Sequence, residues 1–339
     1  MIRLILLLAL ALGCSRPEGP PIRVVIPEGS SMRVAAESLE AARLISTSTG
    51  FRLYGRIAGN DRSLKPGTYL MKRGTPWPEI MKALVGGRGL VRSVTIPEGL
   101  ALAQIADLVG NALEVPPDSV IAAAKDTALL RRLDVPTPTL EGYLFPATYA
   151  FPEGTDTKLA VSEMVRRFEQ EWDSTWNARL TELAMTRHEI VTLASIIEEE
   201  ARLPRERPII SAVYHNRLRI GMALQADPTV QYARGVHAER VTFKDLEIDS
   251  PYNTYKYPGL PPGPISSPGG ESLRAALFPD SADYLYFVAY PDGHHEFRRT
   301  LDEHNAVRAM LRADSNRRAA ASARAAPETP GTPAGPRKR

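Results

Sequence analysis

The sequence predicts an α+β protein in which small strand–turn–helix modules precede a mixed helical and strand domain. A Pro-Glu-Gly motif occurs twice, at Pro27–Gly29 and Pro97–Gly99. Each copy follows a short β-branched run and precedes apolar residues at helical spacing, which is the pattern of a strand, a turn and an amphipathic helix. Helical patterns fill residues 156–202, and a strand pattern follows at 283–290. Residues 314–339, rich in Ala, Arg and Pro, are expected to form a disordered tail.

Composition excludes several classes of function. The chain has 339 residues, 43% hydrophobic and 24% charged, with a net charge of +3, so we expect an ordinary globular protein of two or three compact units. No dense Lys/Arg run lies in a folded segment, which argues against nucleic-acid binding. Cys14 is the single cysteine and the six histidines are scattered. We therefore expect no intrachain disulfide, no metal site and no cofactor.

The amino terminus, residues 1–21, has the pattern of a targeting segment followed by a linker. An apolar run from Leu4 to Gly13 follows Arg3, and it is shorter than the roughly 20 residues of a membrane-spanning helix. Ala11–Cys14 resembles a lipoprotein cleavage box, in which the cysteine is acylated. The alternatives are a short membrane anchor and a plain cleaved signal peptide. All three place the rest of the chain outside the cytoplasm.

Two strand–turn–helix modules are expected next, at residues 22–90 and 91–155. Units of this size resemble the LysM module, a small domain that binds amino sugars, and the alternative is a scaffold without a ligand. The second module ends in the segment Leu140–Tyr149, which is too rich in proline and glycine for a long helix. We expect this segment to be a buried connector that holds one carboxylate, Glu141, among aromatic side chains.

The domain expected at residues 156–313 contains a helix at residues 188–202 that ends in three consecutive glutamates. Its apolar residues share one face, namely Ile190, Leu193, Ala194, Ile197 and Ala201. Glu199 lies opposite this face and should be solvated, whereas Glu198 and Glu200 lie at its two borders. A border carboxyl can be partly desolvated, which raises its pKa while it still faces a cleft. Helical spacing does not choose between Glu198 and Glu200, and the alternative is an ordinary solvated helix end.

Short polar side chains follow among apolar neighbours, at Asn216, Gln225 and Asp227. Such groups are usually buried and hydrogen-bonded, or they line a site. Asp227 has a competing interpretation, because an aspartate before Pro228 could simply cap a helix that starts there.

A loop rich in Pro, Gly and Tyr occupies residues 250–265. It contains Tyr252, Asn253 and Tyr255. Tyrosine rings offer flat platforms for sugar rings, and asparagine can hydrogen-bond to hydroxyl groups. The alternative is a purely structural loop, whose path is fixed by Pro and Gly.

Together, these segments resemble the MltG/YceG-like family, the endolytic murein transglycosylases. The resemblance covers roughly residues 22–312, and the matching segments occur in the family's order and spacing. They are Leu193–Glu200, Asn216–Leu218 with Leu224–Val230, Tyr252–Tyr255 with Gly259–Ile265, Tyr284–Val288 and His304–Asn305. The resemblance implies that Glu200, the second acid of an Ile-Glu-x-Glu stretch, is the catalyst and that Glu141 supports the site. Family members commonly carry a full transmembrane helix, so the short apolar run here leaves the mode of anchoring open.

The activity implied is that of a lyase acting on nascent peptidoglycan without a metal or cofactor. Glu200 would protonate the oxygen that links N-acetylmuramic acid to N-acetylglucosamine, and the substrate's N-acetyl group would help to stabilise the oxocarbenium-like transition state. Glu200 would then take the proton of the C6 hydroxyl, which closes a 1,6-anhydro ring. The candidate supporting and sugar-binding residues are Asn216, Gln225, Asp227, Tyr252, Asn253 and Tyr255. The expected location is the inner (cytoplasmic) membrane, with the catalytic domain outside it and cell-wall synthases as candidate partners.

Two rival functions remain open on the sequence. A hydrolytic muramidase would need a second carboxylate, for which Glu141 or Asp227 could serve, and its products would be reducing ends. A non-catalytic peptidoglycan-binding envelope lipoprotein would be indifferent to the loss of the Glu200 carboxyl.

Overall fold

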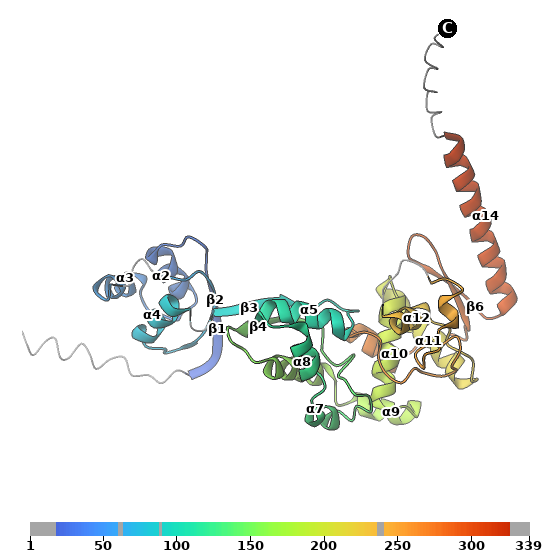
Figure 1. Ribbon diagram of the computed structural model, residues 1–339, viewed down its shortest axis with the longest axis horizontal. Helices are drawn as coiled ribbons and strands as arrows, with labels where there is room; N and C mark the ends of the chain where they lie inside the picture. Colours follow the sequence, from blue (N-terminus) through green and yellow to red (C-terminus); the bar gives the residue numbers. More distant parts are fainter. Residues whose placement is uncertain (1–17, 60–63, 88–89, 236–240, 326–339) are drawn as a thin grey trace, which may run out of the picture. The chain divides into compact units, whose positions relative to one another are not determined.

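The computed structural model describes residues 18–59, 64–87, 90–235 and 241–325, with helices and strands labelled in Figure 1. The expected targeting segment, including Cys14, lies outside these residues except for its last positions, as do residues 326–339 of the expected tail. None of the described helices is both long enough and apolar enough to cross a membrane.

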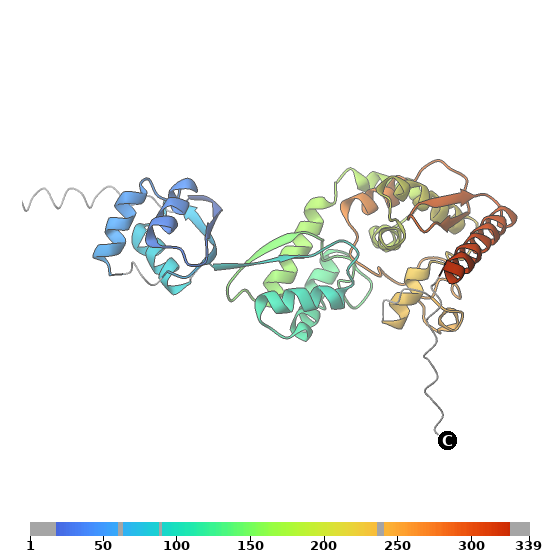
Figure 2. The ribbon, with the colours of Figure 1, turned by 90° about the horizontal axis from the view of Figure 1, so that it is seen from above.

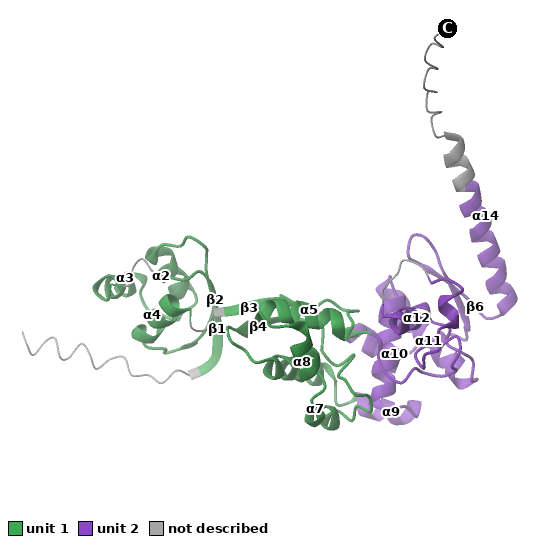
Figure 3. Cartoon of the chain, viewed as in Figure 1, with its two compact units in different colours: residues 1–175, 266–269 green, residues 176–265, 270–339 purple. Residues whose placement is uncertain are grey.

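The chain divides into two compact units, which are coloured separately in Figure 3. Unit 1 extends to Thr175 and also contains Ser266–Gly269. Unit 2 contains Trp176–Ile265 and the residues from Gly270 onward. The boundary was expected at residue 156, but the helix that follows this position packs on a neighbour in unit 1.

Unit 1 contains a four-stranded antiparallel sheet in the order β1-β2-β3-β4. The strands are β1 (Glu18–Ile26), β2 (Gly67–Arg73), β3 (Leu90–Thr95) and β4 (Thr148–Pro152). Residues 18–21, expected to be linker, are therefore strand. Pro20 and Pro21 are tolerated there because β1 is an edge strand, where a missing backbone N–H costs little, and its pairing is irregular between Glu18 and Ile22.

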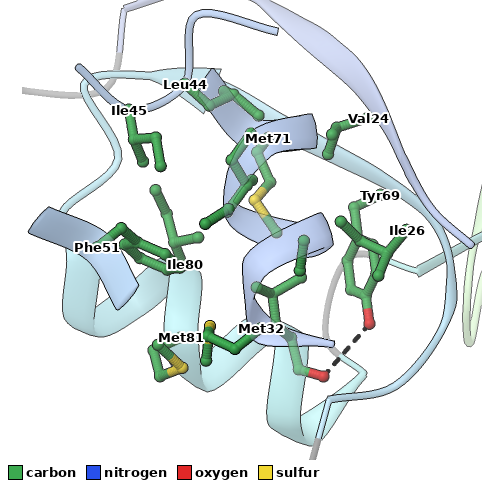
Figure 4. Close-up of a cluster of buried hydrophobic side chains, with 14 residues drawn as sticks. Val24, Ile26, Met32, Leu44, Ile45, Phe51, Tyr69, Met71, Ile80 and Met81 are labelled. Atoms are coloured by element: carbon green, nitrogen blue, oxygen red, sulfur yellow. Dashed lines mark hydrogen bonds between the residues drawn. The ribbon is translucent and has the colours of Figure 1, made fainter. Parts of the chain in front are cut away.

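The first module confirms the predicted order of strand, turn and helix. Its helices are α2 (Met32–Ala41), α3 (Ser48–Ile57) and α4 (Trp77–Gly86). Ser31 caps α2 and Thr47 caps α3 through their hydroxyls, and Gly87 ends α4 in a left-handed conformation with φ of 75°. The apolar faces of these helices and of β1 and β2 form one buried cluster, shown in Figure 4. Within this cluster the Tyr69 hydroxyl donates a hydrogen bond to the Leu84 carbonyl at 3.3 Å.

The second part of unit 1 is mainly helical. Its helices are α5 (Leu102–Leu113), α6 (Pro117–Ala123), α7 (Thr127–Arg132) and α8 (Thr157–Glu171). The connector at residues 140–145 is buried, as predicted. Ser267 joins this unit by pairing its backbone with Gly99 and Leu100, at 3.0 and 2.9 Å. α8 packs on α6, which places it here and not in the second unit.

Unit 2 is organised around one central helix. Its helices are α9 (Trp176–Leu183), α10 (Arg187–Glu200), α11 (Arg207–Arg219), α12 (Asp227–Arg234) and α13 (Gly270–Leu277), with short 3-10 turns η1 (Pro204–Glu206) and η2 (Asp245–Glu247). α10 packs against α11, α12 and α13. The prediction of a single apolar face for α10 was therefore incomplete, because Val191 and Ile196 are buried as well. Glu199, expected to be solvated, is partly buried.

A hairpin and a long helix complete unit 2. β5 (Tyr286–Ala289) pairs with β6 (His295–Arg298), and α14 (Leu301–Ala325) contacts both strands (Figure 2). The helix continues past residue 314, where the disordered tail was expected to begin, and so that expectation is wrong as far as Ala325. Alanine and arginine, which are abundant there, are strong helix formers.

Candidate active site

Glu200 is the last residue of α10 and is partly buried. The start of this helix is fixed by a capping box between Thr186 and Glu189. The Tyr214 hydroxyl, from α11, donates to Glu200 Oε1 at 3.1 Å, and Tyr214 is only 1% exposed. Glu200 is thus a carboxyl held by a buried phenol at the edge of the helical core.

Glu198, the other border position, is engaged elsewhere. Its Oε1 accepts from Arg207 Nη2 at 3.0 Å in a salt bridge whose two side chains are 7% and 11% exposed. Arg207 in turn donates from Nε to Ser272 Oγ of α13 at 2.9 Å. This pairing ties α10 to α11 and α13, which gives Glu198 a structural role and leaves Glu200 as the carboxyl suited to proton transfer.

The surroundings of Glu200 disfavour its ionised form. Burial is the largest cause, and the negative charge of Asp227 is the second; together they raise the pKa of Glu200 to about 7. The hydrogen bond from Tyr214 and the charge of Arg217 act in the opposite direction. A carboxyl with such a pKa can both give and take a proton near neutral pH.

Asp227 is the first residue of α12, but its side chain does not cap that helix. Its Oδ1 instead accepts a hydrogen bond from the Tyr255 hydroxyl at 2.5 Å. Asp227 is exposed and Tyr255 is partly buried. The simple capping interpretation of Asp227 is therefore wrong, because its carboxylate is hydrogen-bonded to Tyr255, 28 positions later in the chain.

The 250–265 loop is anchored to the start of α12 by buried hydrogen bonds. Thr254 Oγ1 accepts from the Ala226 backbone at 3.0 Å and lies 2.8 Å from Thr229 Oγ1. Asn253 is fully buried, and its amide donates to the carbonyls of Leu246 and Ile248, both at 2.9 Å. The loop is thus held by Asn253 and Thr254.

The other residues of the predicted site fall into two groups. The Asn216 amide donates to the carbonyls of Ala282 and Tyr284, both at 2.9 Å, so its N–H groups are used inside the protein.

The second group has exposed surface. Gln225 is exposed in a left-handed conformation with φ of 50°. Tyr252 is partly buried and packs against Tyr232 with ring centroids 4.8 Å apart. Gln225, Tyr252 and Tyr255 therefore have exposed surface, whereas Asn216 and Asn253 position the backbone.

Glu141 belongs to unit 1 and has a local partner there. Glu141 as a residue is 6% exposed, and its Oε1 accepts from the backbone N–H of Leu102 at 2.8 Å. This bond satisfies a free N–H in the first turn of α5 and places a negative charge at the positive end of the helix.

Arg217 lies in the Asn216–Leu218 segment, and its residue type and position alone do not predict its role. It is 6% exposed, and its guanidinium donates to the carbonyls of Leu224 at 2.6 Å and Leu285 at 2.7 Å. It also lies over the Tyr286 ring at 5.3 Å. The spacing in the sequence does indicate one thing: Arg217 follows Tyr214 by three residues, so the two side chains share one face of α11.

Two further features of the described residues concern metal binding and a cavity in unit 2. Within the described ranges there is no cluster of three His, Cys, Asp or Glu side chains that could hold a metal ion. A cavity of about 920 Å³ in unit 2 is lined by the first half of α10, including His188 and Thr192, and by Pro261 and Pro262. Glu200 is not among its lining residues.

Comparison with known proteins places this geometry in a family. The model of the YceG-like family matches residues 24–310. The chain belongs to the YceG-like family. The endolytic murein transglycosylase of Bacillus subtilis (strain 168) is 37% identical over 302 residues, covering 84% of this chain and 83% of the relative. That of Streptococcus pneumoniae (strain D39 / NCTC 7466) is 30% identical over 322 residues, covering 84% of this chain and 58% of the relative.

A solved structure has the same fold as this YceG-like chain. It is the crystal structure of a yceG-like protein from Listeria monocytogenes, with 37% sequence identity and a TM-score of 0.58. The match covers 86% of this chain and 100% of the other.

The raised pKa of Glu200 predicts a cost in stability. Between its ordinary value of 4.5 and about 7, the folded state holds a proton that the unfolded state releases, so stability falls as pH rises through this window. Glu200→Gln removes the ionisable group, and we expect it to stabilise the YceG-like fold by about 1–3 kcal/mol at pH 8. At pH 4 the two proteins should differ little. Urea denaturation at both pH values measures this, and an equal difference at pH 4 and pH 8 would contradict it.

Proposed function

We propose that the chain is an endolytic murein transglycosylase, a lyase that cuts the glycan strands of peptidoglycan, with Glu200 as its acid and base. The observation that carries the proposal is the setting of Glu200. It is partly buried at the end of α10, bonded to Tyr214, and its pKa is raised to about 7. The two relatives that carry this activity in their names support the substrate class.

The mechanism needs one carboxyl in two protonation states. Protonated Glu200 donates to the oxygen between N-acetylmuramic acid and N-acetylglucosamine, and the C–O bond breaks. The positive charge that develops on the muramic ring is stabilised by the substrate's own N-acetyl group. Ionised Glu200 then takes the proton of the C6 hydroxyl, whose oxygen bonds to the anomeric carbon and closes the 1,6-anhydro ring. The proton count balances and no water is consumed.

Neighbouring side chains suit this cycle. Tyr214 donates a hydrogen bond to Glu200, which stabilises the carboxylate left after the first proton transfer. The negative charge of Asp227 raises the pKa of Glu200 and so favours the protonated form needed at the start. We assign Gln225, Tyr252 and Tyr255 to sugar contact, because each has exposed surface, and Asn216 and Asn253 to positioning. Glu141 stabilises the fold of unit 1 through its hydrogen bond to the start of α5.

The parts of the chain outside the catalytic unit bind glycan and anchor the protein. The first module binds amino sugars in the manner of a LysM domain, since its strand–turn–helix order resembles that module. The N-terminal segment anchors the chain to the inner membrane, and the catalytic unit works outside the cytoplasm, where glycan strands emerge from the synthases. Release of full-length protein from membranes by detergent but not by high salt would support such an anchor.

The function is tested by the chemistry of the products. Purified protein is incubated with isolated sacculi, and the released muropeptides are analysed by mass spectrometry. We expect muramic ends that carry the 1,6-anhydro ring, 18 Da lighter than hydrolytic ends because no water is added. Reducing muramic ends as the main product would instead establish a hydrolase, and the absence of both ends would favour a binding protein.

Two substitutions should move the pH profile in opposite directions. Because Glu200 must be protonated to begin the cycle, kcat/KM should fall as pH rises above about 7. Asp227→Asn removes a negative neighbour, which lowers the pKa of Glu200 and moves this fall to lower pH. Tyr214→Phe removes a hydrogen bond to the carboxylate, which raises the pKa further and moves the fall to higher pH. Rates from pH 5 to pH 9 measure both, and shifts of the same sign would contradict this account of the site.

A further inference from the structure

A series of side-chain contacts links the first turn of α14 to the surroundings of Glu200. It runs from His304 through the Tyr286 ring to the Arg217 guanidinium. The His304 ring lies 5.4 Å from the Tyr286 ring, with 35° between their planes. Arg217 lies over that same Tyr286 ring at 5.3 Å. Arg217 is one turn along α11 from Tyr214, which holds Glu200. The motif His304–Asn305, which the mechanism does not use, therefore lies near the proposed catalytic centre.

The position of His304 is set by the capping of α14. Glu303 accepts hydrogen bonds from the backbone N–H groups of Arg299 and Thr300, both at 3.1 Å. The Thr300 hydroxyl accepts from the Glu303 backbone at 3.3 Å. This is a capping box, which fixes where a helix begins. The ring of His304 is thus held in place from both the helix and Tyr286.

One nitrogen of the His304 ring is buried without a hydrogen-bond partner. Among the described residues, Nδ1 of His304 is out of contact with solvent and bonded to nothing, whereas the residue as a whole is partly exposed. A buried N–H without an acceptor is costly. The tautomer that avoids an unsatisfied N–H carries its proton on Nε2 and leaves a bare lone pair at Nδ1.

The charge of the ring is constrained as well. Burial, followed by the positive charges of Arg308 and Arg217, lowers the pKa of His304. The imidazole is therefore neutral at the pH where Glu200 works. His304 presents a neutral N–H donor, next to an aromatic ring, and has no acceptor for it among the described residues.

We propose that His304 binds the glycan, with its Nε2–H donating a hydrogen bond to the acetamido carbonyl of an amino sugar at the partly exposed edge of the His304–Tyr286 pair. This deepens the proposed function and depends on it for the class of ligand. An amide carbonyl is the strongest neutral acceptor on such a sugar, and a neutral donor recognises it without the desolvation cost of a charge. His304 is then a residue for substrate binding, whereas Glu200 performs the proton transfers.

Binding without turnover tests the proposal. The full-length Glu200→Gln protein is titrated by calorimetry with a soluble tetrasaccharide of alternating N-acetylglucosamine and N-acetylmuramic acid. We expect His304→Ala in this background to raise Kd by about five- to tenfold, the worth of one neutral hydrogen bond. His304→Gln keeps a neutral N–H donor and should recover part of the loss. His294→Ala is the matched control, because that exposed imidazole is paired with Asp292 on the β5–β6 turn, and it should leave Kd unchanged.

The acetamido group is tested with a second ligand. The same tetrasaccharide with its glucosamine and muramic nitrogens de-acetylated lacks the proposed acceptor, so His304→Ala should change its Kd by less than twofold. An equal loss for both ligands, or no loss for the acetylated one, overturns the proposal. If His304→Ala does not fold, the same comparison of ligands is made with His304→Phe, which fills the space of the ring but has no hydrogen-bond donor. Failure of the Glu200→Gln parent to bind the acetylated ligand would count against the proposed function itself.

Discussion

Replacing Glu200 with glutamine should lower the rate of 1,6-anhydro product formation by about 10²–10⁴-fold, the range for loss of a general acid–base group. Glutamine keeps the size of the side chain and can still accept the hydrogen bond from Tyr214, which lies 3.1 Å from Oε1 in the native protein. It cannot give a proton to the bridging oxygen or take one from the C6 hydroxyl. The loss should appear in kcat, measured by counting anhydro ends released per minute from sacculi.

The matched control lies one residue away on the same helix. Glu199→Gln removes the same charge, but Glu199 acts on Glu200 only as one of the weaker electrostatic influences. It should retain activity to within a few-fold. Equal losses in the two variants would mean that the charge at the end of α10 matters and not the proton of Glu200.

Replacing Arg217 with methionine should lower the free energy of unfolding by about 3–5 kcal/mol. The guanidinium holds the carbonyls of Leu224 and Leu285 at 2.6 and 2.7 Å, and charge-assisted hydrogen bonds to buried groups are each worth about 1.5–3 kcal/mol. Methionine fills part of the space but leaves both carbonyls without a donor. Urea denaturation of the full chain, followed by circular dichroism, measures the change.

A lysine at the same position separates charge from geometry. Arg217→Lys keeps the positive charge but lacks the planar fork that reaches two carbonyls and stacks on Tyr286. We therefore expect an intermediate loss. If Arg217→Met remained within about 0.5 kcal/mol of the wild type, the role given to Arg217 in joining α11 to the segments around Leu224 and Leu285 would be wrong.

The features predicted well from the sequence are those that neighbouring residues determine. The Pro-Glu-Gly turns separate strand from helix, Gly87 ends α4, and the segment around Glu141 is buried. Each depends on backbone conformation or apolar content within a few residues. The family, too, could be identified, because several motifs occur in one order along the chain.

What the sequence did not reveal depends on partners far along the chain. β1 starts at Glu18 because it pairs with β2 near Arg73, and no local pattern around Pro20 indicates this. α10 is buried on more than one face because α11, α12 and α13 surround it. Helical spacing could not choose between Glu198 and Glu200, since the choice depends on Arg207 and Tyr214 from α11.

The site shows the same limit. Asp227 has the local pattern of a helix cap, and only the fold brings the Tyr255 hydroxyl to it. Asn216 has the polarity of a ligand-binding residue, yet its amide is used by carbonyls 66 and 68 positions away. Residue type and spacing thus indicate the region of the proposed site, whereas the proposed division between sugar contact and positioning depends on the three-dimensional arrangement.

The protonation of Glu200 can be measured directly by titrating its carboxyl carbon. Protein labelled with ¹³C at the glutamate side-chain carboxyl is followed by NMR from pH 3 to pH 9, and the resonance missing from Glu200→Gln is assigned to Glu200. The account predicts that this carboxyl titrates near pH 7, at the same pH as the fall in kcat/KM. Titration near 4.5, or a fall in kcat/KM that does not coincide with it, would contradict the claim that one carboxyl serves as both acid and base.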